Sequence, residues 1–172
     1  MPKSFEKEFI SFCEHQDLEI NINQIAVIKK LEQYNQINFK SFFLKLFSKK
    51  KSKKGFYLYG GVGVGKTMIL NFFYDHLDEK KIKQHFNEFM LGFHDFVHER
   101  KEKNEDNVIN QFVKNLKSKA SLIYFDEFQV TNIVDAMILG KLFEQIFKED
   151  IKIILTSNTK ISELYKEGLQ RE

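Results

Sequence analysis

One short stretch of the sequence combines glycine, lysine and threonine at a spacing that suits phosphate chemistry. Residues 58–67 read LYGGVGVGKT and hold four of the chain's eight glycines. From Gly60 to Thr67 the stretch fits the pattern G-x-x-x-x-G-K-[ST], between the apolar run GFYLY and a segment of helical composition. Glycine lets backbone N–H groups approach a ligand closely, because no Cβ stands in the way. A glycine turn without a ligand is the alternative, and the flanking strand and helix patterns disfavour it.

The pattern predicts a loop that binds the phosphates of ATP. Backbone N–H groups would converge on the phosphates at the positive end of the following helix. Lys66 would place a charge near the β- and γ-phosphates, and the Thr67 hydroxyl would be a ligand of Mg²⁺. The predicted ATP-binding residues are Gly60, Gly61, Val62, Gly63, Val64, Gly65, Lys66 and Thr67.

A second stretch, LIYFDEF, ends four apolar residues with two carboxylates. A buried strand would carry Asp126 to the carboxyl edge of a sheet, where it would hold Mg²⁺ through water. Glu127 would then polarise an attacking water molecule. Taken alone, the pair is better explained as the surface end of a core strand. With the glycine loop upstream, it predicts a Walker B site and ATP hydrolysis.

A third stretch, ILTSN, ends an apolar run in small polar residues. Asn158 is predicted to act as a polar sensor between the γ-phosphate and water, although Thr-Ser-Asn is also common turn chemistry. In P-loop enzymes with a glutamate beside the magnesium aspartate, the sensor strand lies between the P-loop strand and the Walker B strand. We therefore expect its tip to point into the same cleft.

The order of apolar runs predicts an α/β fold of the P-loop NTPase type, with a parallel sheet flanked by helices. Ile22, Ile25, Ile28 and Leu31 recur at helical spacing and predict a helix before the core. We expect a helical segment at 1–48, a lysine-rich linker at 49–54 and the ATPase core at 55–172. The predicted strands are 56–59, 82–86, 122–125 and 151–156, and the predicted helices are 67–79, 89–101, 107–117 and 133–147.

Composition narrows the class of protein. The chain has 172 residues, is 42% hydrophobic and carries a net charge of +3. Its one cysteine, Cys13, cannot form an internal disulfide, no signal peptide is visible, and no apolar segment reaches the ~20 residues that span a bilayer. We therefore expect a cytoplasmic protein with at most peripheral membrane contact. Five lysines in residues 48–54 fit a solvated linker; without interleaved aromatics we expect no nucleic acid partner.

His94 and His98 stand four residues apart in HDFVH, which is close to a zinc-binding pattern. The glutamate of that pattern is replaced by Asp95, and no third ligand is evident in the sequence. We therefore expect these rings to pack or to meet a partner.

Several strings, of which the first contains the glycine loop, resemble one family, the ATPase-family-gene-one-like ATPases of the AAA+ class, a group that includes the cell-division protein ZapE. They are GFYLYGGVGVGKTM, HFNEFMLGFHDFVH, IYFDEFQVTNIVDAMILGKLFEQIF, TSN and LYKEGLQRE, with Asp17 and Gln24 as candidate matches upstream. The chain departs from the family at Asn132, where an acidic residue is usual, and after TSN, where TKISE replaces arginine and prolines.

The resemblance implies ATP turnover coupled to remodelling of a protein partner, with the division machinery as the expected setting, by a homo-oligomer at full length. It also implies an arginine finger, for which Arg171 in GLQRE is a better candidate than Arg100, the other arginine. Family members continue into a further strand and a helical lid, so we expect an incomplete core with an unpaired outer edge at 56–59. The alternatives are a nucleotide-binding interaction module without turnover and a small-molecule kinase. The kinase is disfavoured because the acidic pair suits water activation.

Overall fold

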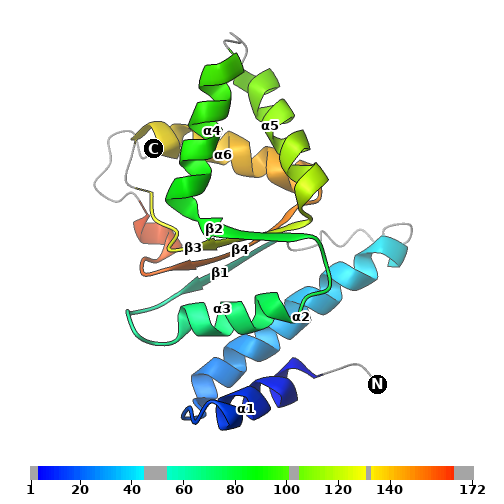
Figure 1. The fold of residues 1–172 in the computed structure, drawn as a ribbon, viewed down its shortest axis with the longest axis vertical. Coiled ribbons are helices and arrows are strands. Elements are labelled where there is room, and N and C mark those ends of the chain that lie inside the picture. The colour runs from blue at the N-terminus through cyan, green and yellow to red at the C-terminus, as the bar shows by residue number, and fades with distance from the viewer. Residues whose placement is uncertain (1–3, 45–53, 101–104, 131–132, 165–172) are drawn as a thin grey trace.

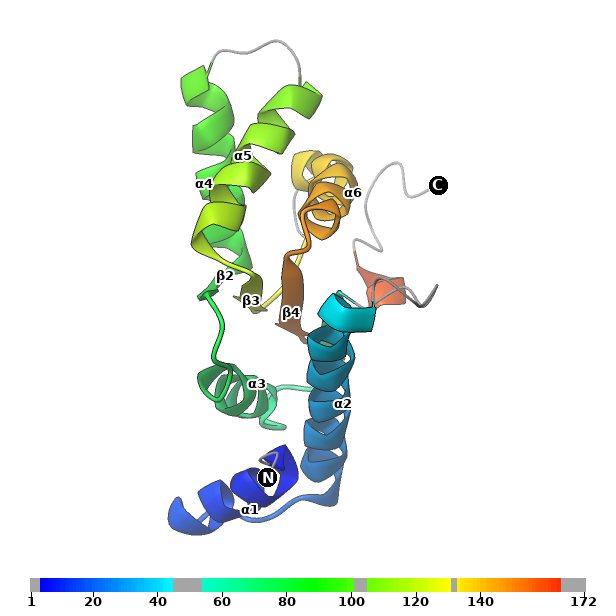
Figure 2. The same cartoon turned by 90° about the vertical axis from the view of Figure 1, so that its right-hand side faces the viewer.

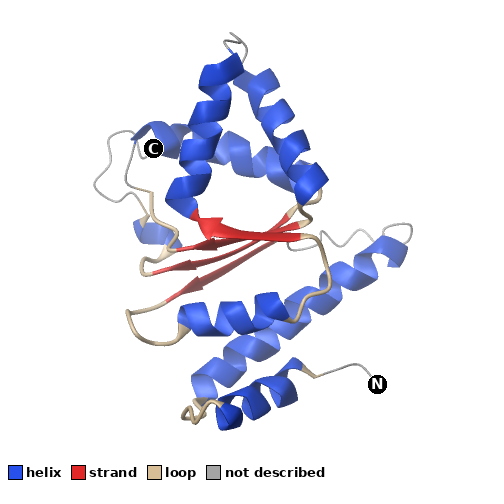
Figure 3. Ribbon diagram, in the orientation of Figure 1, coloured by secondary structure: helices blue, strands red, loops and turns tan. Residues whose placement is uncertain are grey.

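A computed structural model describes residues 4–44, 54–100, 105–130 and 133–164. A parallel sheet lies between two layers of helices (Figure 1, and by element type in Figure 3). The strands are β1 (Gly55–Tyr59), β2 (Lys81–His85), β3 (Leu122–Asp126) and β4 (Lys152–Ser157). The helices are α1 (Phe5–His15), α2 (Ile22–Leu44), α3 (Lys66–Asp75), α4 (Phe86–Arg100), α5 (Glu105–Lys119), α6 (Ile133–Lys148) and the 3₁₀ helix η1 (Ile161–Glu163).

The strand order is β1-β4-β3-β2, with every pair parallel. The predicted α/β fold is therefore confirmed, and so is the position of the ILTSN strand, β4, between β1 and β3. The chain passes from β1 through α3 to the far edge and then returns strand by strand. Right-handed crossovers in opposite directions put α3 on one face of the sheet and α4, α5 and α6 on the other (Figures 1 and 2). Among the described residues, β1 pairs with β4 alone, as expected for an edge strand.

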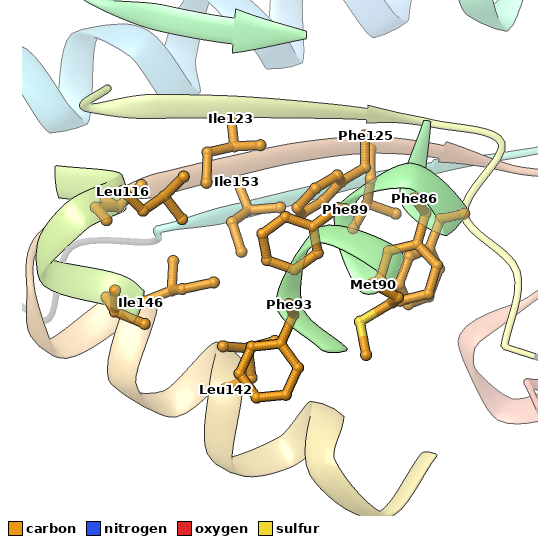
Figure 4. Close-up of a cluster of buried hydrophobic side chains, with 14 of the residues drawn as sticks. Phe86, Phe89, Met90, Phe93, Leu116, Ile123, Phe125, Leu142, Ile146 and Ile153 are labelled. Carbon is orange, nitrogen blue, oxygen red and sulfur yellow. The ribbon is translucent and has the colours of Figure 1, made fainter. Parts of the chain in front are cut away.

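Alternating side chains of β3 divide the core into two clusters, because successive residues of a strand face opposite sides. Leu122 and Tyr124 pack with α1, α2 and α3, whereas Ile123 and Phe125 pack with α4, α5 and α6. By the same alternation, Asp126 at the end of β3 lies on the α3 face. Figure 4 shows the second cluster, where Ile123, Phe125 and Ile153 meet Phe86, Phe89, Met90, Phe93, Leu116, Leu142 and Ile146.

The N-terminal helices share the first cluster. Ile28 and Leu31 of α2 are fully buried, in keeping with their helical spacing, and Phe9 of α1 packs edge-on against Phe72 of α3. Ile22 does not lie on the buried face that the sequence pattern predicted, because it is 84% exposed. It is the first residue of α2 and lies outside the surface that the neighbouring helices cover.

Other details refine the predicted elements. Phe86 was expected to end a strand, and it instead begins α4, with its ring buried against the sheet. Residues 49–53 of the predicted linker lie outside the described residues, and Lys54 pairs with Asp150 at 2.6 Å. None of the described helices combines the length and apolar character needed to cross a membrane.

Candidate nucleotide-binding site

The glycine loop forms an open turn between β1 and α3. Gly63 and Gly65 have φ angles of +80° and +84°, which glycine adopts without the penalty that other residues incur. A Cβ at Gly61 or Gly63 would meet no atom within 4 Å, so one side of the loop is unobstructed. The loop therefore leaves room for a ligand against its backbone, at the N-terminus of α3, which begins at Lys66.

Lys66 folds back over this loop. Its Nζ donates hydrogen bonds to the carbonyl oxygens of Gly60 at 2.9 Å and Gly61 at 2.6 Å. The ammonium group therefore lies within the loop, next to the helix end that attracts anions. A phosphate bound there would meet a charged donor as well as backbone N–H groups.

Asp126 gathers three donors at the end of β3. Asp126 as a residue is 7% exposed, and its Oδ1 accepts hydrogen bonds from Thr67 Oγ1 at 3.2 Å, Thr156 Oγ1 at 2.5 Å and the Glu127 N–H at 3.2 Å. The fold thus brings together Thr67 and Asp126, the two predicted magnesium ligands, from positions 59 residues apart. A hydroxyl and a carboxylate are oxygen ligands of the kind that Mg²⁺ prefers, so these residues fit the ion.

Glu127 occupies a strained backbone position beside this cluster. Its φ of +55° lies in the left-handed region, which costs a residue with a Cβ of order 1 kcal/mol or more. Its N–H is held by Asp126 Oδ1 and by Thr156 Oγ1 at 3.1 Å, while the residue itself is exposed. The turn therefore places the predicted base at the surface of the same strand end.

Thr156 and Ser157 were not predicted as site residues. Thr156 is 2% exposed and links Asp126 to the Glu127 backbone, and Ser157 Oγ donates to the Phe128 carbonyl at 2.8 Å. A signal was present in the sequence, because polar residues that end a fully apolar strand need partners when buried. Asn158, the predicted sensor, is exposed just beyond β4. Arg171 lies outside the described residues.

Gln24 of α2 reaches the loop from the N-terminal helices. Its Nε2 donates to the Val64 carbonyl at 3.2 Å, and a Cβ added to Gly65 would come within 2.7 Å of the same nitrogen. Its Oε1 is buried and has no hydrogen-bond partner within the described parts of the chain. The sequence had offered Gln24 only as part of a family resemblance, without a role.

Tyr124 lies two residues before Asp126 on β3. Burial, aided by the nearby Asp126 charge, raises the pKa of Tyr124 well above its usual range, so its phenol stays protonated.

His94, one of the two histidines in HDFVH, contacts Asp135 of α6. Its Nε2 lies 2.6 Å from Oδ1 of Asp135, and this contact joins α4 to α6.

The fold and this arrangement define a P-loop protein with the α/β architecture of AAA+ ATPases. A family model described as AFG1-like ATPase matches residues 14–172, and the chain belongs to this family. Lactation elevated protein 1 homolog B of Danio rerio is 41% identical over 72% of this chain and 27% of its own length. Cell division protein ZapE of Escherichia coli K12 is 38% identical over 74% of this chain and 35% of its own length.

This chain and the relatives it matches differ in length. The chain spans about a third or less of the curated relatives it matches. Among solved structures, DnaI has a TM-score of 0.52 at 21% identity and covers 88% of this chain and 78% of its own. DnaA from Aquifex aeolicus bound to AMPPCP has a TM-score of 0.57 at 15% identity, covering 95% of this chain and 44% of its own. These structures share the fold.

Proposed function

We propose that this chain binds ATP with Mg²⁺ and hydrolyses it. The contact between Thr67 and Asp126 carries the proposal, because it sets a hydroxyl and a buried carboxylate side by side at the mouth of the glycine loop. Membership of the AFG1-like ATPase family supports it. The AMPPCP-bound DnaA structure, which shares the fold, supports it too.

Each site residue has a distinct part in this proposal. The loop from Gly60 to Gly65 cradles the phosphates through its backbone, and Lys66 exchanges its bonds to the loop carbonyls for bonds to phosphate oxygens. Thr67 and Asp126 hold Mg²⁺, which when bound offsets the charge that develops on the phosphates. Glu127 orients the attacking water and takes its proton, and Asn158 positions the same water.

We further propose that turnover is coupled to remodelling of a protein partner by a homo-oligomer. ZapE is named a cell division protein, which supports the division machinery as the setting. In this arrangement Arg171 completes the site of a neighbouring copy. If so, mixing an Arg171→Ala chain with a Lys66→Ala chain restores part of the activity that each has lost. A mixture that co-assembles without recovery contradicts the role of Arg171.

Turnover is tested by phosphate release from ATP with and without Mg²⁺, in wild type, Glu127→Gln and the control Glu99→Gln. Glutamine keeps the shape of Glu127 but cannot accept a proton, so we expect turnover to fall by ~10²–10⁴-fold while nucleotide still binds. Glu99 is exposed on α4, and its replacement leaves the rate unchanged. If wild type binds nucleotide but releases no phosphate, the chain is an interaction module, and the proposed hydrolysis is wrong.

A further inference from the structure

Tyr124 carries a hydroxyl that the proposed function does not use. The residue is fully buried, and its hydroxyl has no hydrogen-bond partner within the part of the chain that the structure describes. A buried polar group without a partner destabilises the folded state, and native proteins contain few of them. Phenylalanine would fill the same space without that cost, so the hydroxyl calls for an explanation.

The position of Tyr124 suggests the explanation. It stands two residues before Asp126 on β3, so both side chains lie on the α3 face of the sheet. The side chains of Asp126, Thr156 and Thr67 lie near the hydroxyl, although none of them meets the geometry of a hydrogen bond to it. The orphan hydroxyl therefore lies directly behind the candidate magnesium site.

The Oδ1 atom of Asp126 is already fully engaged by other donors in this state. Three donors converge on its Oδ1, those of Thr67, Thr156 and the Glu127 N–H. One carboxylate oxygen has two lone pairs, so this arrangement is crowded. Any change that draws Thr67 or the carboxylate toward a cation relieves the crowding and frees an acceptor for a donor behind it.

We propose that Tyr124 is a positioning residue of the magnesium site, whose hydroxyl pairs with the Thr67–Asp126–Thr156 cluster when Mg²⁺ and nucleotide are bound. This inference rests on the proposed function. Tyr124 contacts neither nucleotide nor cation in it, and acts by holding the side chains that do. In the ligand-free protein the Tyr124 hydroxyl is unpaired, and in the bound protein it forms a hydrogen bond.

The test is Tyr124→Phe, with Tyr74→Phe as a matched control. Tyr74 belongs to the same face, with its ring centroid 5.9 Å from that of Tyr124, and the carboxylate charge that acts on its hydroxyl is that of Asp75. Calorimetry measures the affinity for a non-hydrolysable ATP analogue with Mg²⁺ and with EDTA, and thermal unfolding measures the stability of the ligand-free proteins.

We expect Tyr124→Phe to weaken binding ~5–10-fold with Mg²⁺ and to leave binding in EDTA unchanged, since only the Mg²⁺-bound state uses the hydroxyl. Its ligand-free Tm stays the same or rises, because an unpaired hydroxyl has been removed. A merely structural hydroxyl would not produce this combination. Tyr74→Phe matches wild type in both binding measurements.

The outcomes separate the two proposals. Wild-type affinity of Tyr124→Phe in the presence of Mg²⁺ overturns the role of Tyr124 and leaves the ATPase intact. Equal losses with Mg²⁺ and with EDTA also overturn it, because they indicate a general change in packing. A wild-type chain that binds no nucleotide under either condition overturns the proposed function, and the role of Tyr124 with it.

Discussion

Thr67 at the start of α3 donates a hydrogen bond of 3.2 Å to Asp126 at the end of β3. The two residues come from separate segments: Thr67 follows the loop after β1, and Asp126 is the last residue of β3, a strand parallel to β1 in the same sheet. The contact ties the helix after the glycine loop to the strand with the acidic pair. Substitution of Thr67 or Asp126 is therefore expected to alter nucleotide binding more than the fold.

Lys66→Ala is expected to abolish measurable binding of Mg²⁺–ATP and to leave the fold intact. In the part of the chain that the structure describes, the Lys66 ammonium donates to the Gly60 and Gly61 carbonyls and lies outside both core clusters. Calorimetry measures the binding, and circular dichroism checks the fold. Lys114→Ala, an exposed change on α5, serves as the control. Unchanged affinity in Lys66→Ala would mean that the loop does not bind phosphate through this residue.

Thr156→Val is expected to lower the free energy of unfolding by ~1–3 kcal/mol, whereas Thr156→Ser keeps most of the stability. Valine preserves the shape but leaves the Glu127 N–H and Asp126 Oδ1 without the hydroxyl that joins them. Urea unfolding compares the three proteins. Equal stability of the valine and serine variants would show that the hydroxyl contributes nothing.

Gly63→Ala and Gly65→Ala separate backbone strain from crowding in the loop. Both glycines have positive φ, so each alanine costs ~1–2 kcal/mol from strain. Only at Gly65 does the added Cβ also meet Gln24, at 2.7 Å from Nε2. We therefore expect Gly65→Ala to be the more destabilising change in urea unfolding.

Gln24→Ala completes a double-mutant cycle with Gly65→Ala. Removing the Gln24 side chain removes the crowding, so the cost of Gly65→Ala in that background should fall to about that of Gly63→Ala. If the two changes in the free energy of unfolding are additive, the Gln24 side chain moves away from the added Cβ at no cost. Its contact with the loop would then contribute nothing to the stability.

Cys13 offers a probe of the N-terminal helices. Burial, with a smaller effect of the Glu14 charge, raises the pKa of its thiol, so less thiolate forms at pH 8 than for a free cysteine. We expect Ellman's reagent to label it slowly in the native protein and rapidly in urea. Labelling at the same rate in both conditions would contradict the buried position of α1.

Ile28→Val tests how Cys13 becomes accessible. The change costs ~0.5–1.5 kcal/mol in the cluster that α1 and α2 share with α3, which corresponds to labelling about two- to tenfold faster if this cluster opens. Ile109→Val, in the cluster on the other face, is the matched control. Equal acceleration by both changes would show that the two layers open together.

Much of this site could be predicted from the sequence because its signals are local. The glycine loop needs small residues at set positions, and an apolar run that ends in Asp126 and Glu127 is a short pattern. Strand and helix periodicity predicted the order of elements after residue 55, and the alternation of strands and helices predicted a parallel sheet. The helix α1 lies inside the helical segment expected at 1–48, but it was not predicted as a separate helix, although Phe5, Phe9, Phe12 and Cys13 follow helical spacing.

Contacts between distant segments depended on the tertiary structure. Thr156 meets Asp126 across 30 residues and Gln24 meets Val64 across 40, and no local pattern contains either pair. Strand register decides which side chains face α3, since a shift of one residue would turn Tyr124 and Asp126 to the opposite face. Helix packing likewise decides that Ile28 is buried and Ile22 exposed, although both fit one helical pattern. The sequence by itself determines the residue types and their spacing. Which side chains are buried, and which residues they contact, is decided only when separate segments of the chain pack against one another.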